Sequence, residues 1–396
     1  MRRAALPDDR YPAVSDLRDK ARSKMPFFAW EYLDSGTGEE TAMHRNREAL
    51  DKITISPEFM KGDIDPDPQT ELFGKTYSAP IGIPPIGYTS LMWPGSEQIL
   101  ARTANDKNII HCLSTMASDT MENCGPVSGD NGWFQLYPPR NPEIRADLLK
   151  RAKESGYKTL VITCDVPAPS MRERQRRAGI SIPPKMTPKI LYRIAIRPHW
   201  ALKTLQRGRP SFANMEKYVG GDQGMTFNNI VDFVGQEMGA CLDWNYLREV
   251  REIWEGPIVL KGVLTPEDAR EAVKCGCEGV WVSNHGGRQF EAAPAAIDTL
   301  ADIKAEIGTD AKILFDSGCR NAVDILRAIA LGADFVFLGR PFIYGVGALA
   351  DKGGDHVFDI LYADLLNNMH QLGIDKLEEV RQREIRIDNQ STRSPK

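Results

Sequence analysis

The sequence predicts an α/β protein that folds as one (β/α)8 barrel, the TIM-barrel architecture. From residue 79 onward, short apolar runs alternate with helical patterns, and eight such runs occur in the 396 residues. The runs lack regular alternation of apolar and polar positions, as expected for parallel strands buried on both faces. Eight strands separated by helices favour a closed barrel over an open, doubly wound sheet. The predicted strands are 79–86, 108–115, 133–137, 159–165, 257–263, 279–285, 312–318 and 335–341.

Capping residues mark the helices between these strands. The segment 142–156 has apolar residues at helical spacing and ends in a glycine. Thr265 precedes Pro266 and two acidic residues, the pattern of an N-cap and a first helical turn. A further helix is predicted over 321–331, closed by the glycine that follows it.

Three regions lie outside the barrel pattern of this single domain, residues 1–396. Residues 1–78 form an N-terminal extension with helices of its own. The fourth and fifth strands are joined by a segment far longer than an ordinary loop. Within it, residues 174–227 are predicted to be a lid or insertion, and a polar tail is expected over 384–396.

Composition excludes several classes of protein. The chain has 50 Lys and Arg against 54 Asp and Glu, a net charge of −4, so a nucleic-acid partner is not expected. The hydrophobic fraction of 42% excludes disorder as the main state. No signal peptide and no apolar stretch long enough for a membrane span are found, and the seven cysteines lack a disulfide pattern or a metal-ligand pattern. We therefore expect a cytoplasmic protein without a metal site.

The segment 174–215 is basic and contains no Asp or Glu. Apolar residues are interspersed, among them Leu191, Leu205 and Trp200. One interpretation is a lid over the active site. The other is peripheral contact with an acidic membrane surface at the inner face of the membrane, with Trp200 at the interface.

Polar residues follow nearly every predicted strand, at the barrel end where TIM-barrel sites lie. The last two strands lead into DSGCR (316–320) and LGRP (338–341), where small residues and arginines suit a phosphate group. Lys261 and Gln135, which end two other strands, are expected to reach an aromatic ring system. A phosphate and a ring in these places describe flavin mononucleotide, FMN.

The sixth predicted strand ends in SNHGGR (283–288). Arg288 is suited to grip a carboxylate through two hydrogen bonds, and His285 is suited to accept a proton. Asp165, at the end of the fourth strand, is available to hold the other imidazole nitrogen. The three residues predict chemistry on a small carboxylic acid.

With these motifs the sequence resembles the FMN-dependent L-2-hydroxy acid oxidase and dehydrogenase family over about residues 12–385. SNHGGRQ (283–289) carries most of the resemblance, and FQLY (134–137), LKG (260–262), DSGCR and LGRP support it. The resemblance implies an FMN enzyme that oxidises a lactate- or mandelate-like L-2-hydroxy acid to the 2-keto acid. It also implies oxygen or a quinone-type molecule as electron acceptor, and a homotetramer.

The resemblance assigns roles to particular residues. Catalytic roles fall to His285 as the base, Asp165 as its partner, and Tyr137. The substrate would be bound by Tyr32 of EYLDSG (31–36), Tyr137, Arg172 of SMRERQ (170–175), His285 and Arg288. FMN would be bound by Pro85, Ile86, Gly87, Ser114, Gln135, Thr163, Lys261, Ser283, Asp316, Ser317, Gly318, Cys319, Arg320, Gly339 and Arg340.

Two positions depart from common family patterns. Met116 stands where several members have an aromatic residue beside the substrate's side chain. Gly87 stands where some oxidases have alanine and many dehydrogenases have glycine, which favours a dehydrogenase. Two alternatives stay open: an FMN barrel with non-redox chemistry, like isopentenyl diphosphate isomerase, and a flavin-binding barrel without catalysis.

Overall fold

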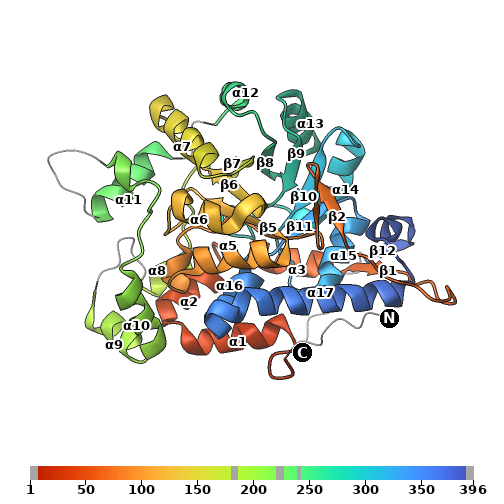
Figure 1. Cartoon of the computed structure of the whole chain (residues 1–396), viewed down its shortest axis with the longest axis horizontal. Coiled ribbons are helices and arrows are strands. Elements are labelled where there is room, and N and C mark those ends of the chain that lie inside the picture. Colours follow the sequence, from red (N-terminus) through yellow and green to blue (C-terminus); the bar gives the residue numbers. More distant parts are fainter. Residues whose placement is uncertain (1–7, 180–185, 220–226, 239–241, 389–396) are drawn as a thin grey trace.

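Eight parallel strands form a closed barrel, as predicted (Figure 1). The computed structural model describes residues 8–179, 186–219, 227–238 and 242–388. Each strand pairs with the next along the chain, and the last strand pairs with the first to close the barrel. The strands are β4 (Ile81–Ile83), β5 (Ile110–Ser114), β6 (Gly132–Leu136), β7 (Thr159–Thr163), β8 (Ile258–Val263), β9 (Gly279–Val282), β10 (Lys312–Phe315) and β11 (Phe335–Phe337).

Large aromatic side chains fill the barrel interior. Trp281 lies over Phe337 with ring centroids 3.9 Å apart, and Trp133 and Phe335 pack in the same cluster. A hairpin of β2 (Thr70–Leu72) and β3 (Lys75–Tyr77) adds side chains to this cluster, and Tyr77 meets Phe335 edge to face. The interior is therefore a packed core, which leaves the rim of the barrel for a ligand.

Helices surround the barrel, and side-chain caps start several of them. Thr265 accepts a hydrogen bond from the Asp268 backbone N–H, and Asn321 does the same for Asp324, at two of the predicted starts. The surrounding helices are α4 (Thr89–Met92), α5 (Ser96–Lys107), α6 (Met121–Ser128), α7 (Pro142–Glu154), α12 (Trp244–Ile253), α13 (Pro266–Lys274), α14 (Ala296–Ile307), α15 (Ala322–Ala330), α16 (Gly339–Leu349) and α17 (Gly353–Leu372).

The N-terminal extension packs onto the barrel as α1 (Val14–Lys24), α2 (Phe27–Asp34) and α3 (Thr41–Asp51). It continues into β1 (Ile53–Ile55), which pairs antiparallel with β12 (Ile385–Ile387) near the other end of the chain. The predicted tail over 384–396 was therefore wrong at its start, because residues 385–387 form a strand. Residues 389–396 lie outside the described residues.

The insertion after β7 contains α8 (Glu173–Arg177), α9 (Pro188–Ala195), α10 (Pro198–Arg207) and α11 (Phe227–Glu237). The predicted place of Trp200 at a membrane interface was wrong: its ring is buried edge to face against Phe28, and its N–H donates to the Leu91 and Met92 carbonyls. The buried Trp200 side chain therefore packs α10 against α2 and α4. Parts of the predicted lid, 180–185 and 220–226, lie outside the described residues.

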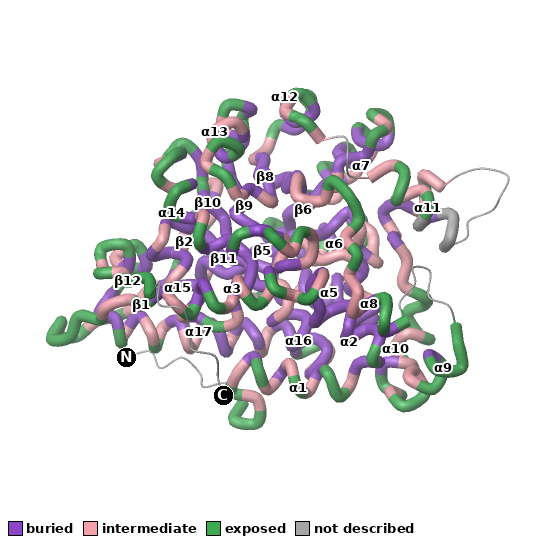
Figure 2. The backbone as a smooth tube through the Cα atoms, turned by 180° about the vertical axis from the view of Figure 1, so that it is seen from behind, coloured by how far each residue is buried: buried purple, intermediate pink, exposed green. Residues whose placement is uncertain are grey.

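Several other apolar side chains of α9 and α10 are exposed, and exposed residues recur along both helices (Figure 2). Leu205 is 82% exposed and Tyr192 65%, with Leu191 and Leu202 also exposed. Within the described ranges, no helix has the length and apolarity needed to cross a membrane.

Candidate active site

The structure brings the predicted site residues together at the carboxyl-terminal ends of the strands. Ser114 and Thr163 are the last residues of β5 and β7, and Ser283 and Asp316 directly follow β9 and β10. Gly339 was expected in a loop after the eighth strand, but it starts α16, so it and Arg340 occupy the first turn of that helix. Backbone N–H groups at a helix start favour an anion.

His285 and Asp165 form the pair that the sequence predicts. The imidazole Nδ1 lies 3.0 Å from Oδ1 of Asp165. Burial alone would raise the pKa of Asp165, but the neighbouring His285 and Lys261 lower it, so the carboxylate is charged. Its other oxygen is buried and has no hydrogen-bond partner among the described residues. The pair is therefore suited to stabilise a protonated imidazole.

The backbone around this pair has an uncommon conformation. His285 has φ 58° and Arg172 has φ 42°, both in the left-handed region that costs non-glycine residues roughly 1–3 kcal/mol. Gly262 has φ 105°, and a Cβ there would lie 2.6 Å from the side chain of Asp165. Only glycine lets β8 pass this close to the carboxylate.

A buried cation stands beside the pair. Lys261 Nζ lies 2.8 Å from Ser283 Oγ and 3.0 Å from Asp316 Oδ2. Burial would lower the pKa of Lys261, but Asp316 and Asp165 raise it, so the ammonium group is held charged. A fixed positive charge at the barrel rim suits a ring that gains negative charge.

Two of the predicted arginines, Arg172 and Arg288, lie at the same end of the barrel. Arg172 donates to Ser170 Oγ and Gln289 Oε1. Arg288 donates to the backbone carbonyls of Tyr32 and Ser35, and its guanidinium lies 5.4 Å from the Tyr32 ring centroid. Tyr32 itself donates to the Gly87 carbonyl at 3.3 Å.

The arginine charges repel one another. Burial and the charges of Arg172 and Arg340 lower the pKa of Arg288 to about 9. Burial and the charge of Arg320 lower the pKa of Arg340 to about 10. An anion bound between these groups would relieve both effects, so the site fits negatively charged ligands.

The remaining residues also fit FMN. Gln135 accepts a hydrogen bond from Ser114, and its amide nitrogen is buried with no partner among the described residues. An unpaired buried N–H group is costly and favours a ligand acceptor. The Cys319 thiol is buried, and burial raises its pKa, so the thiol stays protonated. The positive φ of Gly318 lets the 316–320 loop turn.

Tyr137 directly follows β6 at the same end of the barrel, and its backbone N–H donates to Thr115 Oγ1 at 3.1 Å. Burial, with the nearby charge of Asp165, raises the pKa of the Tyr137 hydroxyl, and the charges of Arg172 and Arg288 act in the opposite direction. The His285–Asp165 pair, Arg172, Arg288 and Tyr137 therefore lie at one end of the barrel, where the charges of Asp165 and the two arginines act on the tyrosine.

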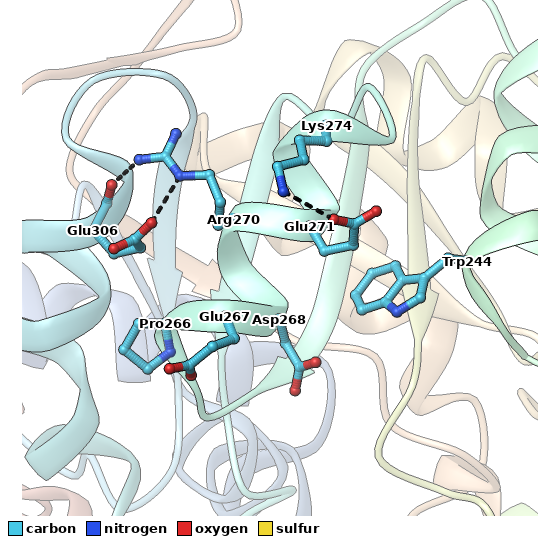
Figure 3. A pocket seen from close by; sticks show the side chains of 8 residues that line it. All are labelled: Trp244, Pro266, Glu267, Asp268, Arg270, Glu271, Lys274 and Glu306. Carbon is cyan, nitrogen blue, oxygen red and sulfur yellow. Dashed lines mark hydrogen bonds and ion pairs between the residues drawn. The ribbon is translucent and has the colours of Figure 1, made fainter.

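A separate groove of about 450 Å³ lies on the outside of the barrel along α13. Figure 3 shows its charged side chains pairing with one another, Arg270 with Glu306 and Lys274 with Glu271. It contains none of the predicted site residues. In the ranges that the structure describes, no cluster of His, Cys, Asp or Glu suits a metal ion.

A TIM barrel with a flavin-compatible rim and an adjoining His–Asp pair defines the class of FMN-dependent oxidoreductases. The chain belongs to the FMN-dependent dehydrogenase family, whose sequence profile matches residues 21–387. The cofactor is therefore FMN, as the phosphate loops and Lys261 predict.

Relatives cover nearly the whole chain. L-lactate dehydrogenase of Pseudomonas syringae pv. syringae (strain B728a) is 33% identical over 369 residues, which is 93% of this chain and 96% of the relative. L-lactate dehydrogenase of Haemophilus influenzae (strain PittEE) is 35% identical over 89% of this chain and 92% of its own. The crystal structure of the monotopic membrane protein (S)-mandelate dehydrogenase has a TM-score of 0.89 at 30% identity, covering 96% of this chain and 100% of that one. Mandelate oxidase has a TM-score of 0.80 at 29% identity, covering 95% and 99%.

Sequence reasoning missed several residues that surround the site. Ser170 and Gln289 accept hydrogen bonds from Arg172. Ser170 lies in SMRERQ (170–175) and Gln289 in SNHGGRQ (283–289), so their closeness in sequence to predicted arginines could have indicated them. Arg174 and Glu31 form an ion pair between segments 143 residues apart, and no local pattern announces such a pair.

Proposed function

We propose that this chain oxidises an L-2-hydroxy acid to the 2-keto acid, with FMN as the first electron acceptor. The observation that carries the proposal is the His285–Asp165 pair, 3.0 Å apart, at the same end of the barrel as Arg172, Arg288 and Tyr137. A general base beside paired cations suits a substrate that carries a hydroxyl group next to a carboxylate. The activities named for the lactate and mandelate relatives support the same substrate class.

In this proposal His285 is the base. Its Nδ1 is occupied by Asp165, so Nε2 is the nitrogen that takes the hydroxyl proton of the substrate. The Asp165 carboxylate stabilises the imidazolium that forms. Tyr137 donates a hydrogen bond to the substrate oxygen, and the raised pKa keeps its hydroxyl protonated. When bound, FMN would accept the Cα hydrogen together with the two electrons of its bond, which leaves the 2-keto acid.

Arg172 and Arg288 bind the carboxylate, with Tyr32 as a third donor. Planar guanidinium groups match the two oxygens of a carboxylate, and burial strengthens charge-assisted hydrogen bonds. The lowered pKa of Arg288 supports this role, because its charge lacks a compensating anion. These contacts also favour a monocarboxylate over a diphosphate, which argues against isomerase-like chemistry and against a barrel without catalysis.

We propose that FMN is held by two groups of residues. Lys261, with Ser283 and Gln135, lies along the ring, and the 316–320 loop with Gly339 and Arg340 binds the phosphate. The ribityl chain and the remaining ring edge would contact Pro85, Ile86, Gly87, Ser114 and Thr163. Support comes from the unpartnered Gln135 amide and from the position of Gly339 and Arg340 in the first turn of α16.

The side chain of the acid faces a mostly apolar wall. Tyr32 meets Tyr88 edge to face, Phe212 packs on Tyr88, and a Cβ at Gly87 would lie 3.1 Å from Met116. This wall supports a lactate- or mandelate-like acid. Oxygen and a quinone-type molecule are the two acceptors to be tested by reoxidation of the reduced protein.

A second proposal concerns the partner surface. Exposed Leu191, Tyr192, Leu202 and Leu205 share α9 and α10 with several cations, which supports peripheral binding to an acidic lipid surface. Flotation with vesicles that contain phosphatidylglycerol should carry the protein. A Leu202→Asp/Leu205→Asp variant should stay behind with its activity intact. Flotation of that variant to the wild-type extent would contradict the proposal and favour a role of 174–227 as a lid.

The homotetramer also remains a proposal. It rests on the family resemblance, because the C-terminal elements are used within one chain: α17 packs on α16 and α15, and β12 pairs with β1. Light scattering of the FMN-loaded protein tests it, and a particle of 44.2 kDa would contradict it.

The oxidation itself is tested with purified protein under nitrogen. Addition of L-lactate or L-mandelate should bleach the flavin absorbance. If no L-2-hydroxy acid in a panel of small and aromatic side chains reduces the flavin, the proposed substrate class is wrong.

A further inference from the structure

Arg174 lies two residues after Arg172, at the start of the insertion, and its guanidinium is surrounded by carboxylates. Nε and Nη2 donate to the two oxygens of Glu31 at 2.6 and 3.1 Å. Nη1 lies 2.9 and 3.1 Å from the two oxygens of Glu40, and Nη2 is 3.5 Å from Asp34. Since these partners occupy all three nitrogens, Arg174 is not free to bind substrate.

The carboxylates belong to the segment that carries Tyr32. Glu31 is the neighbour of Tyr32 on α2, and Glu40 closes the loop that follows α2 by accepting a hydrogen bond from Gly36 N–H. The Glu31 and Glu40 side chains are only 9% and 13% exposed. An ion pair so poorly screened by water is stronger than one on an open surface.

The same loop reaches the segment that carries Arg288. Thr37 N–H donates to the Gly287 carbonyl at 3.1 Å, and a Cβ on Gly36 would lie 2.8 Å from that oxygen. Arg288 in turn donates to the Tyr32 and Ser35 carbonyls at the end of α2. The end of α2 and the loop after it therefore contact both the segment that contains Arg174 and the segment that contains Arg288, which are far apart in sequence.

We propose that Arg174 is a positioning residue that fastens α8 to α2 and so sets the spacing of Arg172, Tyr32 and Arg288 around the substrate carboxylate. Glu173 and Gln175 reinforce the contact: Glu173 accepts from Gly38 N–H, and Gln175 donates to Ser35 Oγ. Arg172 needs such support because its backbone is in the left-handed region. This inference rests on the proposed role of Arg172 in carboxylate binding.

The test measures carboxylate affinity separately from chemistry. The probe is 2-hydroxy-2-methylpropanoate, which has the hydroxyl and the carboxylate but no hydrogen on Cα, so it cannot be oxidised. Its affinity for the FMN-loaded protein is measured by calorimetry in Arg174→Gln, Glu31→Gln and the double variant. Arg176→Gln is the matched control, because Arg176 lies on the same helix, carries the same charge and is exposed.

We expect Arg174→Gln to weaken probe binding about tenfold or more relative to Arg176→Gln, because small displacements of binding groups are costly. Glu31→Gln should also weaken probe binding. The double variant should bind the probe no more weakly than Arg174→Gln, because both single changes break the same Arg174–Glu31 ion pair. With a substrate that reduces the flavin, KM should rise more than kcat falls. FMN content should stay at the wild-type level.

Probe affinity of Arg174→Gln within twofold of the control would overturn the proposal, as would strict additivity of the two single changes. If Arg174→Gln does not fold, Glu31→Gln and Glu40→Gln carry the same test, and unchanged affinity in both would overturn it. Arg172→Met tests the proposed role of Arg172 in carboxylate binding. If it leaves probe affinity unchanged, the carboxylate assignment itself is wrong. If it weakens affinity while Arg174→Gln does not, only the positioning role is wrong.

Discussion

Nδ1 of His285 and Oδ1 of Asp165 lie 3.0 Å apart, although the two residues are 120 positions apart in the chain. Each follows a barrel strand, β9 and β7, and β8 lies between those strands. Gly262 in β8 gives the room for the contact, since a side chain there would meet Asp165. The relationship fixes which imidazole nitrogen is left to act on a substrate.

Asp165→Asn should slow flavin reduction by the hydroxy acid while FMN remains bound. The amide keeps the shape but loses the charge that stabilises a protonated imidazole, and it can present its N–H to Nδ1. We expect a loss of about 10²-fold or more, within the range that general-base catalysis contributes. Stopped-flow measurement of anaerobic flavin reduction over a range of pH checks this. A rate equal to wild type at every pH would contradict the pairing.

Arg288→Lys should bind the substrate carboxylate poorly. A lysine keeps the charge but loses the planar pair of donors, and hydrogen bonds to charged groups contribute about 1.5–3 kcal/mol. The expected loss of affinity is therefore roughly 10- to 150-fold. Titration of the FMN-loaded protein with 2-hydroxy-2-methylpropanoate measures it, with Arg176→Lys as the exposed control. Equal probe affinity in the two variants would show that Arg288 does not bind the substrate carboxylate.

Gln135→Leu should weaken FMN binding by more than it destabilises the apoprotein. The Gln135 amide nitrogen is buried and unpartnered among the described residues, so the ligand-free fold loses only the hydrogen bond that the amide oxygen accepts from Ser114. Titration of apoprotein with FMN, followed by flavin fluorescence, should show a weaker dissociation constant. Tyr157→Phe is the control, because the Tyr157 hydroxyl is also buried and unpartnered in the described structure but precedes β7 at the opposite end of the barrel. Equal weakening in both variants would contradict the assignment.

Asp34→Asn should lower the free energy of unfolding by about 1–3 kcal/mol at pH 7. Burial alone would raise the pKa of Asp34, but hydrogen bonds from Arg18 and Tyr344 lower it. A lowered pKa means that the unfolded state binds more protons, so this stabilisation is present above the ordinary pKa of about 3.9. It is lost as the pH falls through the lower folded-state pKa. Urea unfolding at pH 7, 5, 4 and 3 should show the difference from wild type shrinking only at the acidic end. A constant difference would be inconsistent with the charge as its cause.

The barrel could be predicted because strands buried on both faces are continuous apolar runs in the sequence. Helix caps such as Thr265 and Asn321 are also recognisable from local sequence. The His285–Asp165 pair could be predicted because both residues end strands of a closed parallel barrel, whose ends meet at one rim. The burial of Trp200 could not be predicted, because an apolar residue within a basic segment does not show which part of the chain covers it.

The contacts of Arg174 could not be predicted in the same way. Its partners Glu31 and Glu40 lie in the N-terminal extension, and nothing local in either segment indicates that they meet. In the sequence Arg174 was one cation of a basic run, and only the packing of α8 against α2 shows it paired. Long-range pairs of this kind depend on the completed fold.

The role of His285 as the base is tested most directly by the rate of anaerobic flavin reduction in His285→Gln compared with wild type, measured with the hydroxy acid that reduces wild type fastest. General-base catalysis contributes ~10²–10⁴-fold, so we expect a rate lower by at least 10²-fold with FMN still bound. A rate within tenfold of wild type would contradict the assignment of His285 as the base and would direct attention to Tyr137.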